Sequence, residues 1–538
     1  MAVDRAGAQR GRHRTVTNAR RVAPLARPIR RRRSRRRAMR FHLALPLAAL
    51  CFGACASATD REAAIVGAMV RADGALLRSR PALVAGKYAR MARFDEGREG
   101  LYDYYRGEAP VFRADLADAR LPLARTRFSA ALPLPFSMGD AHPENFGILV
   151  DASGVPALEP NDLDAADRLP YYYDLRRLTV GIVLAVRASN ADDETAHRAA
   201  VAAEGDVVRA CVRGYRDAIH EIAAGAPLAR FTDDGGSAVV ADLFARSAAG
   251  RTTTLSSLTT LDADGHRQLL RGPLDPADRE QVLVPLAEPA LAALPGLLDQ
   301  ARRAMSPPRG AEELAVLDAA RLLGSGVASW PRVRILVLVR GASDAPEDDL
   351  VLEVKELGDS GAPAVVPPFR PADQPAARIE LARSLVWAVP DADPRWVAVP
   401  SFLGMPVQVR SETDAHPTLR VRRLHDELGT VPELEALARV LGALLARVTA
   451  RSLAGDRAPA VAIDAALAGD PEGFVEDEVT VAIDEADRIE EDFESFRDAL
   501  DRLGPTLGVR VDPADAPSPD VQALFCVPPV VPSPGAYR

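Results

Sequence analysis

Hydrophobic positions recur at helical spacing over much of the chain. We expect helices over residues 60–80, from about Asp174, over 191–225 as an Ala-rich pair, over 431–455 and over 475–503. Residues 278–323 show the same spacing, broken at Ser306-Pro307-Pro308, where proline stops a helix. Residues 81–135 are mixed in pattern. The chain therefore predicts a largely helical protein on both sides of its middle section.

The middle section has a different pattern, typical of strands. Val333–Val339 and Leu350–Val354 are β-type runs joined by the polar segment Gly341–Asp349, which predicts a hairpin. A helix is expected over 374–388 and further strands over 396–424. Helices followed by a hairpin and more helices favour the α+β class.

Length and composition allow the chain to be divided into segments. With 538 residues, 48% of them hydrophobic and 26% charged, the chain is long enough for one two-lobed enzyme or for two or three domains. We divide it into an Arg-rich extension with a signal peptide (1–55), a helical lobe with the candidate catalytic loops (56–310), a β-rich lobe (311–430), C-terminal helices (431–503) and a Pro-rich tail (504–538).

Charge is concentrated at the N-terminus. Residues 1–38 contain fourteen Arg and one Asp, a net charge of +13, so residues 39–538 carry −21 of the total of −8. An acidic body argues against nucleic acid as a partner. The basic head could bind nucleic acid or anionic lipid, but we favour its absence from the mature protein, with translation starting at Met39.

The segment after Met39 is typical of an export signal. Arg40, the apolar run Leu43–Leu50 and the small residues before Cys55 resemble a signal peptide ending in a bacterial lipobox. Cys55 would then carry lipid, attach the protein to a membrane and place it in the cell envelope. A buried N-terminal helix, with a cytoplasmic protein, is the alternative. Of the remaining cysteines, Cys211 and Cys526 could pair or stay buried thiols.

Two short polar segments carry the candidate chemistry. The first is Gly139-Asp140-Ala141-His142-Pro143-Glu144-Asn145, and the second is Asn161-Asp162-Leu163-Asp164. Protein kinases place a catalytic Asp five residues before a metal-binding Asn, the spacing found here. We therefore predict Asp140 as the catalytic base and Asn145, Asp162 and Asp164 as ligands of Mg²⁺. The alternative is that these residues only form turns.

Two further residues of these segments are expected to order the loop. His142 lies between the candidate base and the candidate ligand, and a ligand role is its alternative. Asp174 opens the expected helix and would cap it or orient the loop.

The nucleotide is expected to bind at the β-rich segment. Gly324 and Gly326 precede the hairpin, where glycine lets backbone N–H groups approach phosphates. The chain has two lysines, Lys87 and Lys355, among 67 basic residues, so a retained lysine suggests a role for a compact ammonium. Lys355 ends a β-type run and would bind ATP phosphate, with Glu380 as its ion-pair partner. We expect Lys87 to lie on the surface.

Taken together, these motifs resemble the bacterial family known as domain of unknown function 2252, over roughly residues 84–503. Its Gly-Asp-x-His-x-x-Asn element is similar to that of aminoglycoside phosphotransferases. The resemblance rests on Tyr105-Arg106-Gly107, Gly139–Gly147, Asn161–Asp164, Asp174–Leu178, Gly324–Gly326, Glu353–Glu356 and Val421-Arg422-Arg423-Leu424. It implies a kinase-like fold, with Asp140 as the base and Asn145 and Asp162 as metal ligands.

The chain departs from that pattern in three ways. Ser329, followed by Trp330 and Pro331, stands where a third glycine is expected, and Thr449 replaces an expected His. The glycine loop and Lys355 follow the catalytic loop, whereas they precede it in ordinary kinases. The kinase-like two-lobed fold would then be circularly permuted. If residues 81–135 formed the small lobe instead, Lys87 would take the role of Lys355.

The sequence therefore predicts a kinase-like phosphotransferase that uses ATP and Mg²⁺ on an unknown small-molecule or protein acceptor. The alternatives are an exported pseudokinase that only binds ligands, and a metal-dependent hydrolase built on the Asp and His residues of the two motifs. A deep site lined by Lys355 would favour the kinase over the hydrolase.

Overall fold

A computed structural model describes most of the chain after the N-terminal extension. The described residues are 58–93, 99–129, 134–188, 194–253, 255, 257–274, 281–310, 312–362, 374–413, 415–421, 430–451, 457–510 and 524–525. Residues 56–538 form a unit separate from residues 1–55. The Arg-rich extension, the expected signal peptide with Cys55, Cys526 and the motif residues 422–424 lie outside the described residues.

Helices form most of the unit of residues 56–538. Their bounds are α1 (Ala58–Ser79), α2 (Pro81–Met91), α3 (Glu99–Gly107), α4 (Ala109–Ala117), α5 (Tyr171–Ala188), α6 (Glu194–Ala202), α7 (Glu204–Ala223), α8 (Ala238–Thr253), α9 (Glu288–Ala304), α10 (Pro375–Val386), α12 (Val431–Arg451), α13 (Ala458–Leu467) and α14 (Pro471–Leu503). In the described part of the chain, no helix is both long enough and apolar enough to cross a membrane.

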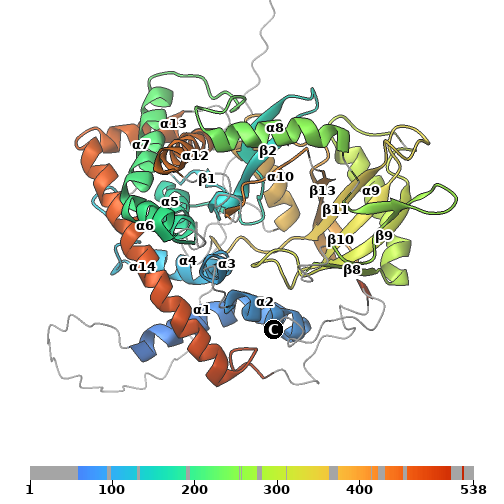
Figure 1. Cartoon of the computed structure of the whole chain (residues 1–538), viewed down its shortest axis with the longest axis horizontal. Coiled ribbons are helices and arrows are strands. Elements are labelled where there is room, and N and C mark those ends of the chain that lie inside the picture. The colour runs from blue at the N-terminus through green and yellow to red at the C-terminus, as the bar shows by residue number, and fades with distance from the viewer. Residues whose placement is uncertain are drawn as a thin grey trace, which may run out of the picture. The chain divides into compact units, whose positions relative to one another are not determined.

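The helices α7 and α12 lie against each other with their backbones in close approach (Figure 1). A Cβ atom added to Gly214 would stand 2.3 Å from the Arg439 carbonyl oxygen, and one added to Gly442 would stand 2.0 Å from the Cys211 carbonyl oxygen. Glycine at both crossing points is therefore what allows this contact. Cys211 itself is a buried free thiol.

The other large element is an antiparallel sheet of seven strands (Figure 1). Its order is β12-β13-β11-β10-β9-β8-β7, with bounds β7 (Gly272–Pro273), β8 (Val282–Pro285), β9 (Val316–Leu323), β10 (Arg334–Val339), β11 (Leu350–Glu356), β12 (Val397–Phe402) and β13 (Met405–Glu412). Alternate residues of β10 enter different cores: Ile335 and Val337 pack in the cluster that includes α9, and Leu336 and Leu338 pack on the opposite face.

Four short strands and one helical turn carry the two polar motifs. β1 (Phe136–Ser137) pairs with β4 (Asp167–Arg168), and β2 (Phe146–Val150) pairs with β3 (Pro156–Pro160). The 3₁₀ turn η1 (Pro143–Asn145) leads into β2. The first motif therefore fills the connection from β1 to β2, and the second fills the connection from β3 to β4. A separate ribbon joins β5 (Thr259–Leu261) to β6 (Arg267–Leu269).

The α+β class and the hairpin of β10 and β11 are confirmed. The expected helix over 278–323 is wrong at both ends, because β8 and β9 are strands and α9 alone is helical. In β9, Val316, Ala319, Ala320 and Leu323 have the i, i+3, i+4, i+7 spacing of a helix. Pairing with β8 and β10 decided the conformation instead, since a buried strand can be apolar on both faces.

A buried ion pair joins α5 to α14. The Arg176 guanidinium donates to Glu478 at 2.6 Å and 2.9 Å, and both side chains are at most 1% exposed. Arg176→Met should lower the free energy of unfolding by about 3–5 kcal/mol, because the Glu478 carboxylate is left buried without a counter-charge. Urea unfolding measures this change. The matched control is Arg213→Met, whose exposed pair with Glu472 joins α7 to the same helix and should be worth less than about 1 kcal/mol. Equal losses in the two variants would contradict the prediction.

Candidate active site

The two motif loops are held against each other by a glycine. Gly139 has a φ of +78°, and a Cβ atom there would stand 2.0 Å from the Ala165 carbonyl oxygen. Both the positive φ and the close approach require glycine at this position. The backbone N–H of Asn161 also donates to the backbone carbonyl oxygen of Asn145 at 3.0 Å. These contacts bring the Asp140 loop beside the Asp162 loop.

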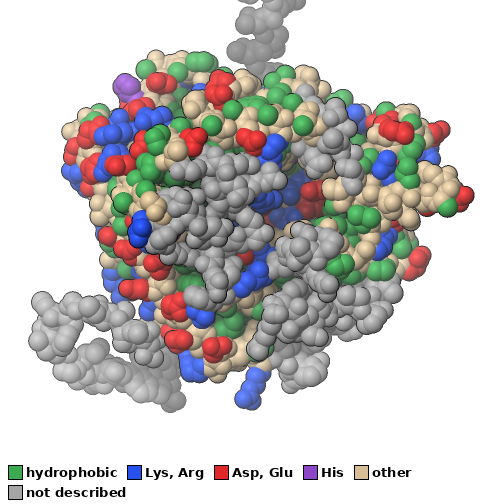
Figure 2. All heavy atoms as spheres, in the orientation of Figure 1, with side chains coloured by type: hydrophobic (Ala, Val, Ile, Leu, Met, Phe, Trp, Pro, Cys, Tyr) green, Lys and Arg blue, Asp and Glu red, His purple; other side chains and the backbone are tan. Residues whose placement is uncertain are grey.

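The two loops open into a cavity of about 1500 Å³. Its lining includes Asp140, His142, Asn145, Asp162, Asp164, Gly326 and Lys355. Figure 2 shows Lys and Arg side chains in the hollow at the centre of this face, with acidic side chains beside them. Segments as far apart in the sequence as Asp140 and Lys355 therefore share one site, which is the placement that the motif spacing and the scarcity of lysine predict.

Asp140 is held by a buried guanidinium. Arg177, on α5, donates through Nε to Asp140 Oδ1 at 2.8 Å and through its other nitrogens to Glu108 at 2.6 Å and to the Tyr105 carbonyl oxygen at 2.8 Å. Burial alone would raise the pKa of Asp140, but the positive charge of Arg177, with contributions from His142 and Arg113, lowers it below its ordinary value. The Asp140 side chain is 18% exposed and ionised. We did not predict a role for Arg177 from the sequence.

His142 lies beside this carboxylate without a close bond to it. Its Nε2 atom is 3.9 Å from Asp140 Oδ2, and its Nδ1 atom is buried with no hydrogen-bond partner among the described residues. Burial is the largest cause that lowers the pKa of His142, to about 4, against an upward effect of Asp140. The imidazole is therefore neutral near pH 7.

Asp174 bonds to the loop from inside α5. Its carboxylate accepts hydrogen bonds from the backbone N–H groups of Met138 at 2.6 Å and Gly139 at 2.9 Å. Burial, the largest cause, raises the pKa of Asp174 to about 7 although both backbone bonds lower it. Its geometry suits a residue that orients the Asp140 loop.

Asn145 is oriented by the same loop. Its amide nitrogen donates to the Asp140 carbonyl oxygen at 2.8 Å, which leaves the amide oxygen as the atom able to bind a cation.

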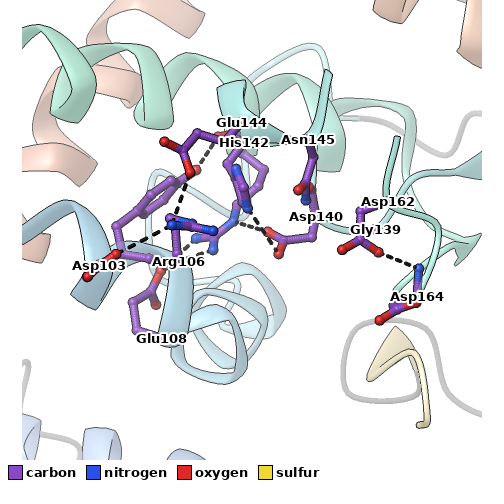
Figure 3. Close-up of polar contacts among 12 residues, drawn as sticks. Asp103, Arg106, Glu108, Gly139, Asp140, His142, Glu144, Asn145, Asp162 and Asp164 are labelled. Carbon is purple, nitrogen blue, oxygen red and sulfur yellow. Dashed lines mark hydrogen bonds and ion pairs between the residues drawn. The ribbon is translucent and has the colours of Figure 1, made fainter. Parts of the chain in front are cut away.

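Lys355 reaches both candidate metal ligands of the second loop. Its ammonium lies 3.2 Å from Asp162 Oδ2 and forms an ion pair with Asp164 Oδ2. The lysine is 2% exposed, and the carboxylate side chains are 31% and 24% exposed (Figure 3 shows both carboxylates). Burial raises the pKa of Asp162, but the nearby Lys355 and Arg410 lower it well below its usual range. Gln408 donates to Asp164 Oδ1 at 2.9 Å and further fixes this carboxylate.

The glycine loop lies at the end of β9. Gly324 and Gly326 have φ values of +74° and +76°, so both positions favour glycine. Ser325 to Ser329 line the cavity. Ser329, found in place of the expected third glycine, accepts a hydrogen bond from Arg334 at 3.1 Å, and Trp330 is buried. The loop therefore faces the site, with Ser329 tied to the sheet.

Two sequence expectations are corrected by these contacts. Glu380 does not pair with Lys355; it bonds to Arg383 at 2.7 Å and to the backbone N–H of Ala398 at 2.7 Å, because α10 presents it toward β12. Lys87 is not on the surface: it is 2% exposed, lines the cavity and pairs with Asp73 at 2.7 Å.

Comparison with known proteins identifies the family of this chain. A family model described as an uncharacterized protein conserved in bacteria (DUF2252) matches residues 78–499. The chain belongs to this family. The match to DUF2252 covers both motif loops, the glycine loop and Lys355. No curated protein and no solved structure matches the chain.

The buried His142 makes stability depend on pH. Its pKa is about 4 in the folded protein and 6.5 in an unperturbed histidine, so between these values the unfolded chain binds a proton that the folded protein does not. The free energy of unfolding should therefore fall by about 3 kcal/mol from this group as the pH drops from about 6.5 to about 4. Urea unfolding of the wild type and of His142→Gln between pH 7 and pH 4 measures it.

The control for this measurement is His220→Gln, because His220 is an exposed residue of α7 paired with Asp464. His142→Gln should have a smaller loss of stability on acidification than either the wild type or His220→Gln. If all three proteins lose the same free energy, His142 does not carry the effect.

Proposed function

We propose that this chain is a phosphotransferase that moves the γ-phosphoryl group of ATP, with Mg²⁺, to a hydroxyl group of a small-molecule or protein acceptor. The observation that carries the proposal is the position of Lys355. It lies 193 residues after Asp162 in the chain, yet its ammonium contacts both Asp162 and Asp164 in the cavity that Asp140 and Asn145 also line. A carboxylate base, oxygen ligands and a buried lysine are the parts that phosphoryl transfer needs.

In the proposed reaction, the acceptor hydroxyl oxygen forms a bond to the γ-phosphorus of ATP. The bond from that phosphorus to the β–γ bridging oxygen breaks, and ADP leaves with its electron pair. The hydroxyl proton passes to Asp140 and then to water. Arg177 holds Asp140 ionised and in place, and Asp174 holds the backbone of the same loop.

The residues present suit a magnesium ion. Asp162, Asp164 and the amide oxygen of Asn145 are hard oxygen donors, and both carboxylates are partly exposed in the cavity. When bound, Mg²⁺ would neutralise charge on the transferred phosphoryl group. Lys355 already balances one of the two carboxylates, so the ion is expected to bind together with the nucleotide phosphates rather than alone.

The proposed fold is a permuted kinase-like arrangement. Three features support it: the catalytic loop precedes the strand that bears Lys355, that strand is the second of the hairpin after the glycine loop, and the loop of Asp162 faces it. The two lobes would be the helical part and the seven-stranded sheet.

A pseudokinase is the second candidate, favoured by the glycine loop. Ser329 replaces the third glycine, and the buried Trp330 follows it. A hydrolase built on Asp140, His142, Asp162 and Asp164 is less favoured, because such a site has no need of the buried Lys355 that pairs with Asp162 and Asp164.

A thermal-shift screen tests the proposal. ATP with Mg²⁺ at about 100 times its dissociation constant should stabilise the protein by about 2.7 kcal/mol. ATP without Mg²⁺ and Mg²⁺ without ATP should each give much smaller shifts. Equal shifts with and without Mg²⁺ would contradict a shared metal and phosphate site.

A further inference from the structure

Both lysines of the chain line the same cavity. Among the described residues, twelve Lys and Arg side chains line it, and Lys87 and Lys355 are both among them. Each is 2% exposed and paired with aspartate. A chain that uses arginine almost everywhere else thus keeps a compact ammonium at two places in one site. Lys355 has a place in the proposed function, and Lys87 does not.

Charge is divided unevenly around the cavity. Six cations come from α1 to α4 and the residues next to them: Arg71, Lys87, Arg90, Arg93, Arg106 and Arg113, which we call the basic wall. The described lining residues of the same segment include two acids, Asp73 and Asp103, so the net charge of this described part is +4. The rest of the described lining has six cations and eight acids, a net charge of −2. The wall opposite the candidate metal ligands is therefore strongly positive, in a chain whose residues 39–538 carry −21.

Several donors of the basic wall have no acceptor among the described residues. The Nε atoms of Arg106 and Arg113 are buried without a hydrogen-bond partner there. An ammonium has three donors, and Asp73 is the hydrogen-bond partner described for Lys87. Buried donors without acceptors are unfavourable unless a ligand supplies the acceptors.

The basic wall contacts the catalytic loop. Arg106 lies 3.0 Å from Glu144, and Arg113 donates to the Gly139 carbonyl oxygen at 3.2 Å. Figure 3 shows Asp103 and Arg106 on one side of Asp140, and Asp162 and Asp164 on the other. A molecule on the basic wall would thus meet Asp140 from the side opposite the metal ligands. The cavity of about 1500 Å³ exceeds the roughly 300–1,000 Å³ of a typical single-ligand site, so it has room for two ligands.

We propose that the basic wall binds an anionic group of the acceptor, so that the substrate is a hydroxyl compound bearing phosphate or several carboxylates. This inference rests on the proposed function for the transfer itself, and it adds the substrate class. Lys87, Arg106 and Arg113 bind the anionic group, and Asp140 then faces the hydroxyl.

The same charge pattern excludes a polycationic acceptor. An aminoglycoside carries several ammonium groups, which a wall with a net charge of +4 repels. The motif similar to aminoglycoside phosphotransferases therefore does not carry their substrate class to this chain.

The test is a calorimetric titration of the full chain with inorganic pyrophosphate in the absence of Mg²⁺. The wild type is compared with Asp73→Asn/Lys87→Met, which removes both charges of the buried pair and leaves neither unpaired. Lys355→Met is the matched variant on the other wall. Arg106→Gln is the second basic-wall variant, and thermal unfolding checks the fold of each. Kanamycin and Mg²⁺ with the non-hydrolysable analogue AMP-PNP are titrated in parallel. Pyrophosphate is also titrated into protein that is already saturated with Mg²⁺·AMP-PNP.

We expect one pyrophosphate to bind to the wild type. Its affinity should be about ten-fold lower in Asp73→Asn/Lys87→Met and in Arg106→Gln. Its affinity should change by less than about three-fold in Lys355→Met, and also in wild-type protein that holds Mg²⁺·AMP-PNP. Kanamycin should not bind. Any one of four results would overturn the inference. Two concern the site: pyrophosphate binding is lost in Lys355→Met alone, or Mg²⁺·AMP-PNP competes with pyrophosphate. The other two are that the wild type does not bind pyrophosphate, or that it binds kanamycin. If pyrophosphate binds as expected and Mg²⁺·AMP-PNP does not bind, the proposed ATP-dependent function fails and the anion site stands.

Discussion

Asp140→Asn should reduce phosphoryl transfer by about a thousand-fold, because general-base catalysis by a positioned side chain contributes about 10²–10⁴. Asparagine keeps the size of the side chain but cannot accept the hydroxyl proton. Nucleotide binding should persist, since Lys355 and the second loop are unchanged. Release of ADP from ATP, measured with the wild type and the variant in parallel, gives the ratio.

Asp118→Asn is the control for this variant. Asp118 forms a surface pair with Arg120 next to α4 and does not line the cavity. Its removal should leave ADP release unchanged. If Asp140→Asn releases ADP at the wild-type rate, Asp140 is not the base, and turnover would require a different group.

Lys355→Arg should lower the affinity for Mg²⁺·ATP by about 100-fold although the charge is kept. The ammonium is 2% exposed and contacts two carboxylates in a space that a larger planar guanidinium does not fit. The arginine would therefore lose the position from which the ammonium is expected to contact the nucleotide phosphates. Titration calorimetry with Mg²⁺·AMP-PNP measures the change.

Arg340→Lys provides the reverse substitution at an exposed position. Arg340 follows β10 of the same sheet and pairs with Asp344 on the surface, so the exchange should leave nucleotide affinity unchanged. Unchanged affinity in Lys355→Arg would show that the lysine has no contact with nucleotide.

The sequence predicted well what depends on short spacing. Asp140 and Asn145 are five residues apart, and so short a loop keeps the two side chains close to each other wherever the loop lies in the fold. Asp162 and Asp164 were expected beside them because a second carboxylate, on a turn that follows the catalytic loop, completes the metal site of a kinase-like phosphotransferase. Lys355 was predicted to lie in the same site because lysine is scarce in the chain. That argument uses composition and does not depend on how far apart the residues are in the sequence.

Contacts between distant segments could not be predicted in the same way. Arg177 was visible in the motif after Asp174, but its buried bonds to Asp140 and Glu108 depend on how α5 packs against α3 and α4. Glu380 was assigned to Lys355 from order along the chain, whereas it pairs with Arg383 of the same helix and accepts a hydrogen bond from Ala398 of β12. The scarcity argument applied equally to Lys87, but its partner Asp73 lies on the preceding helix, and only the turn at Pro81 brings them together.

Titration calorimetry with AMP-PNP, with and without Mg²⁺, tests the shared metal and phosphate site in the wild type, Asp162→Asn and Lys355→Met. We expect Mg²⁺-dependent binding of one nucleotide to the wild type. The affinity should be about 100-fold or more lower in each variant, because both residues would contact the same metal and phosphate cluster. Absence of binding to the wild type, or binding that neither variant nor removal of Mg²⁺ changes, would contradict this expectation.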